Sequence, residues 1–422
     1  MKILIVSYFF PPYNCVGSVR VGKTAKYLIQ LGHDVRVISA DDQPLQKTLD
    51  LEIPSNLVYY TQWFNVNFFI EKLLGGREKI AQQGYVFGKQ DDKFSSKLFN
   101  KIKDFYKCFF HFPDQQIGWL PFAVNQAKKM LETWQPDIIY ASAMPFTSLL
   151  VAAQIHYISG IPWIAEFRDL WTDGHNYHYP MFRSFFEKKL EYNVLRSSKG
   201  LVTVSQPLAE TLKKYNKSVE VIFNGFDPND YPTSYHTQAS SEFINITYTG
   251  IVYPAKQEIK PFFDSIEANL PAKINFYSRT IHALNKFIKN KEYINNCIFL
   301  HHPIPHKEAL KAQYNADVLL FFLWKNKAGI LSGKIFEYIG AGKPILAIGS
   351  PEDSAAKLIK NNNLGVVLSD PKKIADQIKD WADQKKKNGC VSYNSNIESY
   401  SEFTRLEQTK KLESFLKKVL LL

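Results

Sequence analysis

Short apolar runs alternate with longer helical patterns along nearly the whole chain, and this alternation limits the folds that are open to it. The beginning of the chain is the clearest case. Residues 3–7 have the composition of a buried strand, residues 20–31 that of a helix, and residues 35–39 that of a second strand. A strand, a helix and a further strand in this order form a βαβ unit, whose strands are parallel. The sequence therefore predicts an α/β protein built on parallel sheets.

The same alternation continues in two halves. Further strands are expected at 137–141, 163–166, 200–204, 219–223, 244–249, 274–277, 297–300, 318–322 and 344–348. A chain of 422 residues is too long for a single hydrophobic core. The turn at 224–227 and the polar stretch at 233–241 lie between the halves and indicate a hinge. We predict an N-terminal domain at 1–220, a C-terminal domain at 221–401 and a terminal amphipathic helix at 402–422.

One segment of the second half, 328–346, combines a small-residue turn, a helix and a buried strand. Ser332 and Gly333 can open the helix at Lys334, which leaves free backbone N–H groups that suit a phosphate. Lys334 puts a positive charge at the helix start, so an anion is expected beside it. Glu337 follows on the same face and can accept two ribose hydroxyls, as the acidic residue of dinucleotide folds does. An ordinary αβ unit with a Lys–Glu surface pair explains the same pattern.

Charged residues also follow a strand in the first half. Glu166, Arg168 and Asp169 come at the C-terminal end of a predicted strand, where parallel sheets bind ligands. Asp169 can bind or help to deprotonate a hydroxyl, and Arg168 can hold a phosphate; an Arg–Asp pair that only shapes the loop is the alternative. Gly17 and Arg20 stand at the start of the first helix and are expected to contact a substrate. A tight turn with a surface arginine is the alternative there.

Composition narrows the partners of the chain. The net charge of +12 favours a polyanion, an anionic membrane face or a phosphorylated substrate. Nucleic acid is not expected, because the sequence has neither a zinc-finger spacing nor an RNP-type aromatic signature. No apolar run approaches about 20 residues, so no membrane-spanning helix is expected. The four cysteines are far apart, without metal or redox spacing. This favours a reducing compartment and predicts a cytoplasmic protein, peripheral at the inner membrane face.

The segment 93–112 alternates lysines with aromatic and aliphatic residues. As a helix it would carry an apolar face bordered by Lys97, Lys101 and Lys103. Such a helix can lie on an anionic leaflet, and we expect membrane contact there. A helix that packs its apolar face on its own domain is the alternative.

Metal ligands are not indicated. His301, His302 and His306 form a histidine cluster, but a metal there would need a further ligand that the sequence does not offer. We interpret these histidines as part of a loop that leads into a helix. The aspartate pairs at 41–42 and 91–92 are interpreted as solvated loop residues, so no metal and no cofactor is predicted.

Several motifs occur in an order that is typical of one family. They are a glycine loop around Gly17 after the first strand, Pro113-Asp114 with Gly118-Trp119, and the segments 166–171, 204–208, 224–227, 248–250 and 332–338. In this collinear set the chain resembles the glycosyltransferases of family 4, and within them the branch found in bacterial surface-polysaccharide clusters.

The resemblance implies the GT-B fold, with two facing Rossmann-like domains and a central cleft. The N-terminal domain would bind the acceptor, a lipid-linked or growing surface glycan, and the C-terminal domain the nucleotide-sugar donor, a UDP-sugar. Transfer with retention of anomeric configuration is implied. Fixed cations and amide dipoles aimed at the leaving diphosphate can replace a divalent metal, so no obligatory metal is expected. The resemblance assigns donor binding to Gly17, Arg20, Gly250, Ser332, Gly333, Phe336 and Glu337, acceptor binding to Glu166 and Arg168, and catalysis to Asp169, Lys256 and Lys334.

Two positions depart from the family pattern. The first carboxylate of the family's paired-glutamate motif falls on Gly329, so backbone amides at 329–331 are expected to take over part of its role. The family's diphosphate-binding arginine falls on Ile251, whereas Lys256 keeps the lysine position, and Arg279 is a candidate substitute. Two alternatives therefore stay open: a nucleotide-sugar epimerase on the same fold, and a non-catalytic assembly subunit that kept the fold.

Overall fold

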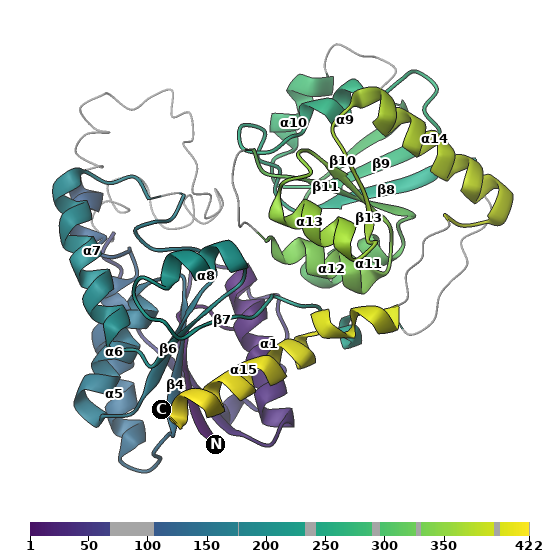
Figure 1. Ribbon diagram of the computed structural model, residues 1–422. Coiled ribbons are helices and arrows are strands. Elements are labelled where there is room, and N and C mark those ends of the chain that lie inside the picture. Colours follow the sequence, from purple (N-terminus) through teal and green to yellow (C-terminus); the bar gives the residue numbers. More distant parts are fainter. Residues whose placement is uncertain are drawn as a thin grey trace. The chain divides into compact units, whose positions relative to one another are not determined.

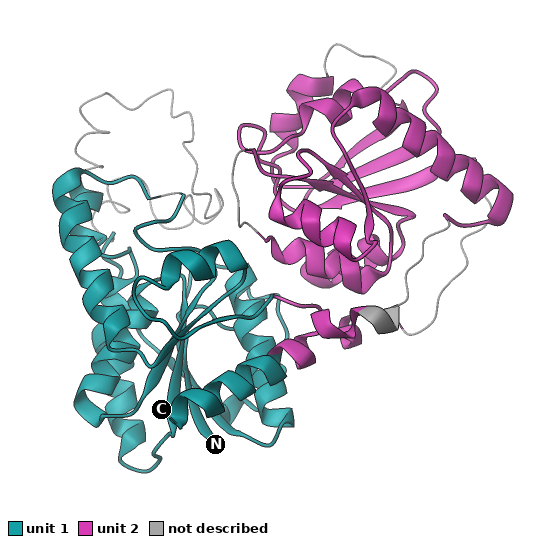
Figure 2. Cartoon of the chain, in the orientation of Figure 1, with its two compact units in different colours: residues 1–223, 409–422 teal, residues 224–408 magenta. Residues whose placement is uncertain are grey.

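The chain forms two compact units in the computed structural model. One unit comprises residues 1–223 and 409–422, and the other comprises residues 224–408 (Figure 2). The structure describes residues 1–67, 105–175, 177–232, 242–288, 296–325, 331–391 and 397–421. Gly329, the pair at 91–92 and the first part of the segment 93–112 lie outside the described residues.

Seven parallel strands form the sheet of the first unit, in the order β3-β2-β1-β4-β5-β6-β7. The strands are β1 (Lys2–Val6), β2 (Asp34–Ala40), β3 (Val58–Thr61), β4 (Ile138–Ala143), β5 (Trp163–Phe167), β6 (Gly200–Thr203) and β7 (Val219–Val221). The helices are α1 (Val16–Gln30), α5 (Leu120–Leu131), α6 (Thr147–Ser159), α7 (Met181–Arg196), α8 (Gln206–Leu212) and α15 (Arg405–Leu420), with the short turns η1 (Ser55–Leu57) and η2 (Ile117–Trp119).

Alternate residues of β1 face opposite sides of this sheet and both sides are buried, which is why residues 3–6 are all apolar. Leu4 and Val6 pack in the core that α5 and α6 cover, whereas Ile3 and Ile5 pack in the core that α1 and α15 cover (Figure 1). The sheet is thus buried between two helical layers, as the continuous apolar runs predicted.

The C-terminal helix α15 supplies a large part of the second of these cores. Leu412, Phe415, Leu416 and Val419 are all buried in it. A Cβ atom at Gly200, the first residue of β6, would lie 2.8 Å from the Phe415 ring. The glycine therefore lets the helix approach the sheet closely.

Six parallel strands form the sheet of the second unit, in the order β10-β9-β8-β11-β12-β13. They are β8 (Ile244–Thr249), β9 (Ala272–Tyr277), β10 (Ile298–His301), β11 (Val318–Phe322), β12 (Ile345–Ile348) and β13 (Gly365–Leu368). The helices are α9 (Lys260–Asp264), α10 (Ile281–Ile288), α11 (His306–Tyr314), α12 (Gly333–Ala341), α13 (Ser354–Asn361) and α14 (Pro371–Asn388), with the turns η3 (Pro228–Asp230) and η5 (Ile397–Phe403).

The α/β class and the parallel sheets are confirmed. The sequence pattern missed two strands, β3 and β13, and both lie at the edge of their sheets. The residues of β13 are half-buried throughout, and so is the middle of β3. An edge strand packs only part of its surface, and its sequence therefore lacks the apolar run that marks a central parallel strand. Among the described residues, no helix is both long and apolar enough to cross a bilayer.

Candidate functional site

Several polar residues of the second unit lie at the carboxyl edge of its sheet. In a parallel sheet every strand ends at the same edge, and the following helices begin there. Thr249 and Gly250 leave β8 at this edge, α11 begins there after β10, and α12 begins there after β11. Residues far apart in the sequence are thereby brought to one place.

The start of α12 has the predicted geometry. Ser332 is the N-cap, and its hydroxyl accepts a hydrogen bond of 3.3 Å from the backbone N–H of Lys334. The helix begins at Gly333, so the N–H of Gly333 points out of the helix end and can bind an anion. The predicted capping by Ser332 is confirmed.

Lys334 lies over the ring of Tyr248, with its ammonium nitrogen 3.8 Å from the ring centroid. Gly250 makes room for this side chain, because a Cβ atom there would stand 3.2 Å from the lysine Nζ. Gly250 also has a φ of +106°, a backbone conformation that residues other than glycine rarely adopt. Burial lowers the pKa of Lys334 to about 7, although the charge of Glu337 opposes this shift. The neutral amine, which is populated near pH 7, is thus poised to gain a proton when an anion arrives.

Glu337 is held from two sides by residues of α11. Nε2 of His306 donates to its carboxylate at 3.1 Å, and Nε2 of Gln313 donates at 3.0 Å. Gln313 also donates to the Thr249 hydroxyl at 2.8 Å, which ties the arrangement to β8. The carboxylate keeps about a third of its surface open, at 30% side-chain exposure. It is therefore oriented, yet still accessible to a ligand.

The charges of His306 and Glu337 stabilise each other. Burial raises the pKa of Glu337, but the hydrogen bond and charge of His306 outweigh it, so the pKa lies below its usual value. Burial lowers the pKa of His306, but the hydrogen bond and charge of Glu337 outweigh burial, so the pKa of His306 lies above its usual value. Glu337 is consequently a carboxylate acceptor at neutral pH. Its ion-pair partner is His306 and not Lys334, which corrects the Lys–Glu surface pair considered above.

His306 is the residue that sequence reasoning missed. It begins α11, as the predicted loop-to-helix transition required, but it was expected to be an ordinary loop residue. Its partner is 31 positions away on another helix. Only the packing of α11 against α12 makes them neighbours, so no local spacing could have indicated the pair.

Lys256 lies in the turn that leaves β8. Its backbone N–H donates to the Tyr253 carbonyl at 2.9 Å, and its carbonyl accepts from the N–H of Lys325 at 2.8 Å. Arg279 is exposed and follows β9 at the same edge. Both cations therefore belong to the edge at which α12 begins. Phe336, by contrast, is fully buried, with its ring centroid 6.1 Å from that of Phe403, so only its backbone is placed to meet a ligand.

In the first unit Arg20 and Glu166 form a buried ion pair. Both nitrogens Nε and Nη2 of Arg20 lie 2.7 Å from Oε1 of Glu166. The guanidinium also donates to the carbonyls of Phe223 and Ile222, and the carboxylate accepts from Ser142 at 2.6 Å and from the Tyr140 hydroxyl. With side-chain exposures of 4% and 0%, neither charge is offered to a ligand in this structure.

Gly17 and Arg168 are brought together at the start of α1. A Cβ atom at Gly17 would stand 2.5 Å from Nη1 of Arg168, so a larger residue there would require the guanidinium to move. Arg168 donates to the carbonyls of Ala143 and Met144, both at 2.9 Å. Asp169 is exposed, and no hydrogen bond or ion pair joins it to another described residue. The Arg168–Asp169 structural pair considered above is therefore not formed.

Comparison with known proteins supports the resemblance stated above. The family model described as Glycosyltransferase Family 4 matches residues 91–230. The resemblance to family 4 glycosyltransferases is thereby confirmed. No curated protein matches the chain.

Solved structures resemble nearly the whole chain. Anabaena HepE in complex with UDP and glucose has a TM-score of 0.61 and 14% identity, over 99% of this chain and 100% of that one. The lipopolysaccharide outer core galactosyltransferase WaaB has a TM-score of 0.55 and 11% identity, over 99% of both chains. TarM of S. aureus, with Fondaparinux, α-GlcNAc-glycerol and UDP, has a TM-score of 0.59 and 10% identity, over 98% and 99%. The fold is therefore GT-B.

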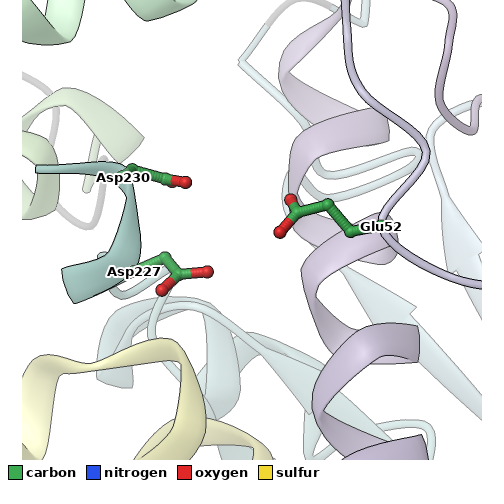
Figure 3. Close-up of side chains that lie close together, drawn as sticks. All are labelled: Glu52, Asp227 and Asp230. Carbon is green, nitrogen blue, oxygen red and sulfur yellow. The ribbon is translucent and has the colours of Figure 1, made fainter.

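Figure 3 draws three carboxylates, Glu52 of the first unit and Asp227 and Asp230 of the second. Glu52 and Asp227 already have hydrogen-bond or ion-pair partners within their own units. Glu52, in the first unit, pairs with Lys23 at 2.7 Å and Lys26 at 2.6 Å. Asp227, in the second unit, caps η3 by accepting from a backbone N–H. No metal site is assigned to them.

Proposed function

We propose that the protein is a retaining glycosyltransferase that transfers a sugar from a UDP-sugar to a lipid-linked or growing surface glycan in the cytoplasm. The family match supports the reaction class. The observation that carries the donor site is the oriented carboxylate of Glu337 beside the capped start of α12. UDP is bound in the structures of HepE and TarM, which supports the uridine nucleotide.

In this proposal Glu337 accepts the two ribose hydroxyls of the donor. Breaking the sugar–phosphate bond leaves negative charge on the departing diphosphate. Lys334, Lys256 and the backbone N–H of Gly333 at the start of α12 stabilise that charge, and Gly250 lets the phosphates approach. Fixed cations of this kind supply the stabilisation that a divalent ion gives in other sites, so we propose that no metal is needed.

In the first unit we propose an acceptor role for the loop after β5. Asp169, which is exposed and free among the described residues, would bind or deprotonate the acceptor hydroxyl. Arg168, fixed against Gly17, would meet a phosphate. Arg20 and Glu166 would act through the structure, by holding α1 to β5, and not by direct contact with either substrate.

An epimerase is the second candidate. A putative UDP-N-acetylglucosamine 2-epimerase from Listeria monocytogenes has the same fold, with a TM-score of 0.52 and 11% identity over 99% of this chain and 96% of that one. Such an enzyme needs only the donor. The experiment is therefore to incubate the purified protein with radiolabelled UDP-sugars, with and without membranes of its own cell. Label in the lipid or polymer fraction supports transfer; an epimeric UDP-sugar formed without membranes contradicts it.

Donor affinity is expected to fall as pH rises above 7. Below that pH Lys334, whose pKa is about 7, is charged with or without ligand. Above it, binding of the diphosphate must take up a proton, so affinity drops by up to about tenfold per pH unit until the pKa of the complex is passed. Calorimetry with a UDP-sugar, in buffers of different ionisation enthalpy, measures both effects.

The Lys334→Arg variant is the matched control for this pH dependence. Arginine stays charged throughout the range, so the variant should bind with a nearly flat profile. His306 and Glu337 face the same site and remain in the variant. An unchanged slope in Lys334→Arg would assign the pH dependence to that pair and contradict the role of Lys334.

A further inference from the structure

The beginning of α7 exposes large apolar side chains. Met181 is 88% exposed, Phe185 66% and Phe186 60%, and Phe182 is half exposed. These four residues lie within the first six positions of the helix. Contiguous exposed apolar surface of this kind commonly marks an interaction site.

A second helical segment, at 105–110, extends this surface. Phe105 and Phe109 are exposed and have their ring centroids 4.7 Å apart. Phe109 lies 5.9 Å from Phe182 by the same measure, so the two segments form one continuous patch. We call Phe105, Phe109, Met181, Phe182, Phe185 and Phe186 the aromatic surface.

The aromatic surface is built on a rigid base. Arg183, on the buried side of α7, donates to the carbonyl of Lys107 at 2.7 Å and to that of Pro113 at 3.2 Å. It also pairs with Glu187 at 2.8 Å, and both side chains of this pair are 1% exposed. Glu187 in turn accepts from the indole of Trp171 at 2.8 Å. The polar contacts of α7 are thus turned inward, and the aromatic residues are held outward.

The exposed charges of α7 are all positive. Its acidic residues, Glu187 and Glu191, are buried, whereas Lys188, Lys189 and Arg196 are exposed. Lys188 and Lys189 lie seven positions after Met181 and Phe182, on the same face of the helix. They stand about 10 Å further along the axis, since each residue rises about 1.5 Å. The exposed residues of the helix therefore change from aromatic to cationic between Phe186 and Lys188.

We propose that the aromatic surface docks the first unit on an anionic lipid bilayer. Met181, Phe182, Phe185 and Phe186 enter the acyl boundary, and Lys188 and Lys189 meet the lipid phosphates. A second copy of the chain fits less well, because a symmetric contact would set these lysines against their own copies. Docking at a bilayer goes beyond the transfer reaction and stands on exposure and charge that do not depend on it.

The test is flotation of the full-length protein with vesicles of phosphatidylcholine, with and without about 30 mol% phosphatidylglycerol. We expect the wild type to float with the anionic vesicles and to be released by salt. The double variant Phe185→Ser/Phe186→Ser and the double variant Lys188→Glu/Lys189→Glu should each lose about tenfold or more in partition coefficient.

Matched controls come from the second unit. Phe299→Ser removes an exposed aromatic residue of β10, and Lys372→Glu/Lys373→Glu reverses two exposed charges of α14. Both should float as the wild type does. Wild-type protein that ignores anionic vesicles, or aromatic-surface variants that float equally well, would overturn the proposal. Self-association lost in Phe185→Ser/Phe186→Ser, without vesicle binding, would assign the surface to a second copy. Unchanged UDP-sugar binding in these variants separates docking from the proposed reaction.

Discussion

Glu337→Ala is expected to weaken binding of the nucleotide-sugar by about a hundredfold, because two hydrogen bonds from ribose hydroxyls to a charged acceptor are lost, at about 1.5 kcal/mol or more each. The loss falls on the ground state, so KM or Kd should rise far more than kcat falls. The variant also leaves His306 and Gln313 without the acceptor that they share. Calorimetric titration with UDP-sugar measures the change in affinity directly.

The matched control for this substitution is Glu267→Ala. Glu267 is an exposed carboxylate of the same unit, in the segment before β9, at the opposite edge of the sheet, and it pairs with Lys379. Its removal should leave affinity within about a factor of two, as expected for a surface ion pair. His306→Gln, which keeps a donor but removes the charge, should fall between the two. Equal affinity of Glu337→Ala and Glu267→Ala would contradict the ribose assignment.

Arg20→Met is expected to lower the free energy of unfolding of the first unit by about 3–5 kcal/mol, because it leaves the carboxylate of Glu166 buried without its counter-charge. The carbonyls of Ile222 and Phe223 lose a donor as well. Urea unfolding followed by tryptophan fluorescence is suited to this, since most of the tryptophans are in the first unit: Trp63, Trp119, Trp134, Trp163 and Trp171.

The pH dependence of this variant has a defined sign. In the wild type, burial raises the pKa of Glu166, but Arg20 and the hydrogen bonds of Ser142 and Tyr140 leave it below its ordinary value of 4.5. The pair therefore contributes stability above that pH, and the contribution is lost as pH falls through the folded pKa. In Arg20→Met burial dominates and the pKa rises. The deficit relative to wild type should be largest at neutral pH and should shrink as pH falls from the raised pKa of the variant, above 4.5, to the lowered pKa of the wild type, below 4.5.

Two further variants complete this test. Arg20→Met/Glu166→Gln removes both charges and should regain part of the loss, because no uncompensated charge stays buried. Arg196→Met removes an exposed arginine and should change stability by no more than about 0.5 kcal/mol. An Arg20→Met variant as stable as Arg196→Met would contradict the structural role of Arg20 and favour a role in ligand binding.

The sequence predicted those features whose cause is local. The strand β1, the helix α12 and its capping by Ser332 follow from apolar runs and from the chemistry of single turns. The placement of Lys334 at the start of α12 follows in the same way. These elements also locate the candidate donor site, because the carboxyl edge of a parallel sheet is fixed by the order of strands and helices.

The features that the sequence did not predict depend on contacts between distant segments. The pairing of His306 with Glu337 needs α11 beside α12, and the seating of Arg168 against Gly17 needs β5 beside the start of α1. Burial is also a property of the assembled unit. For that reason Arg20 resembled a surface residue at a helix start, although its guanidinium is enclosed by β5 and the segment after β7.

The most direct test of the central claim is a thermal-shift screen of UDP-, GDP-, dTDP- and CMP-sugars against the wild type and Glu337→Ala. A ligand that binds only the folded state stabilises it by about 2.7 kcal/mol at a hundred times its Kd. The account predicts that UDP-sugars raise the melting temperature of the wild type and that Glu337→Ala, equally well folded, loses the shift. No shift with any nucleotide, or an equal shift in both proteins, would contradict a donor site at Glu337.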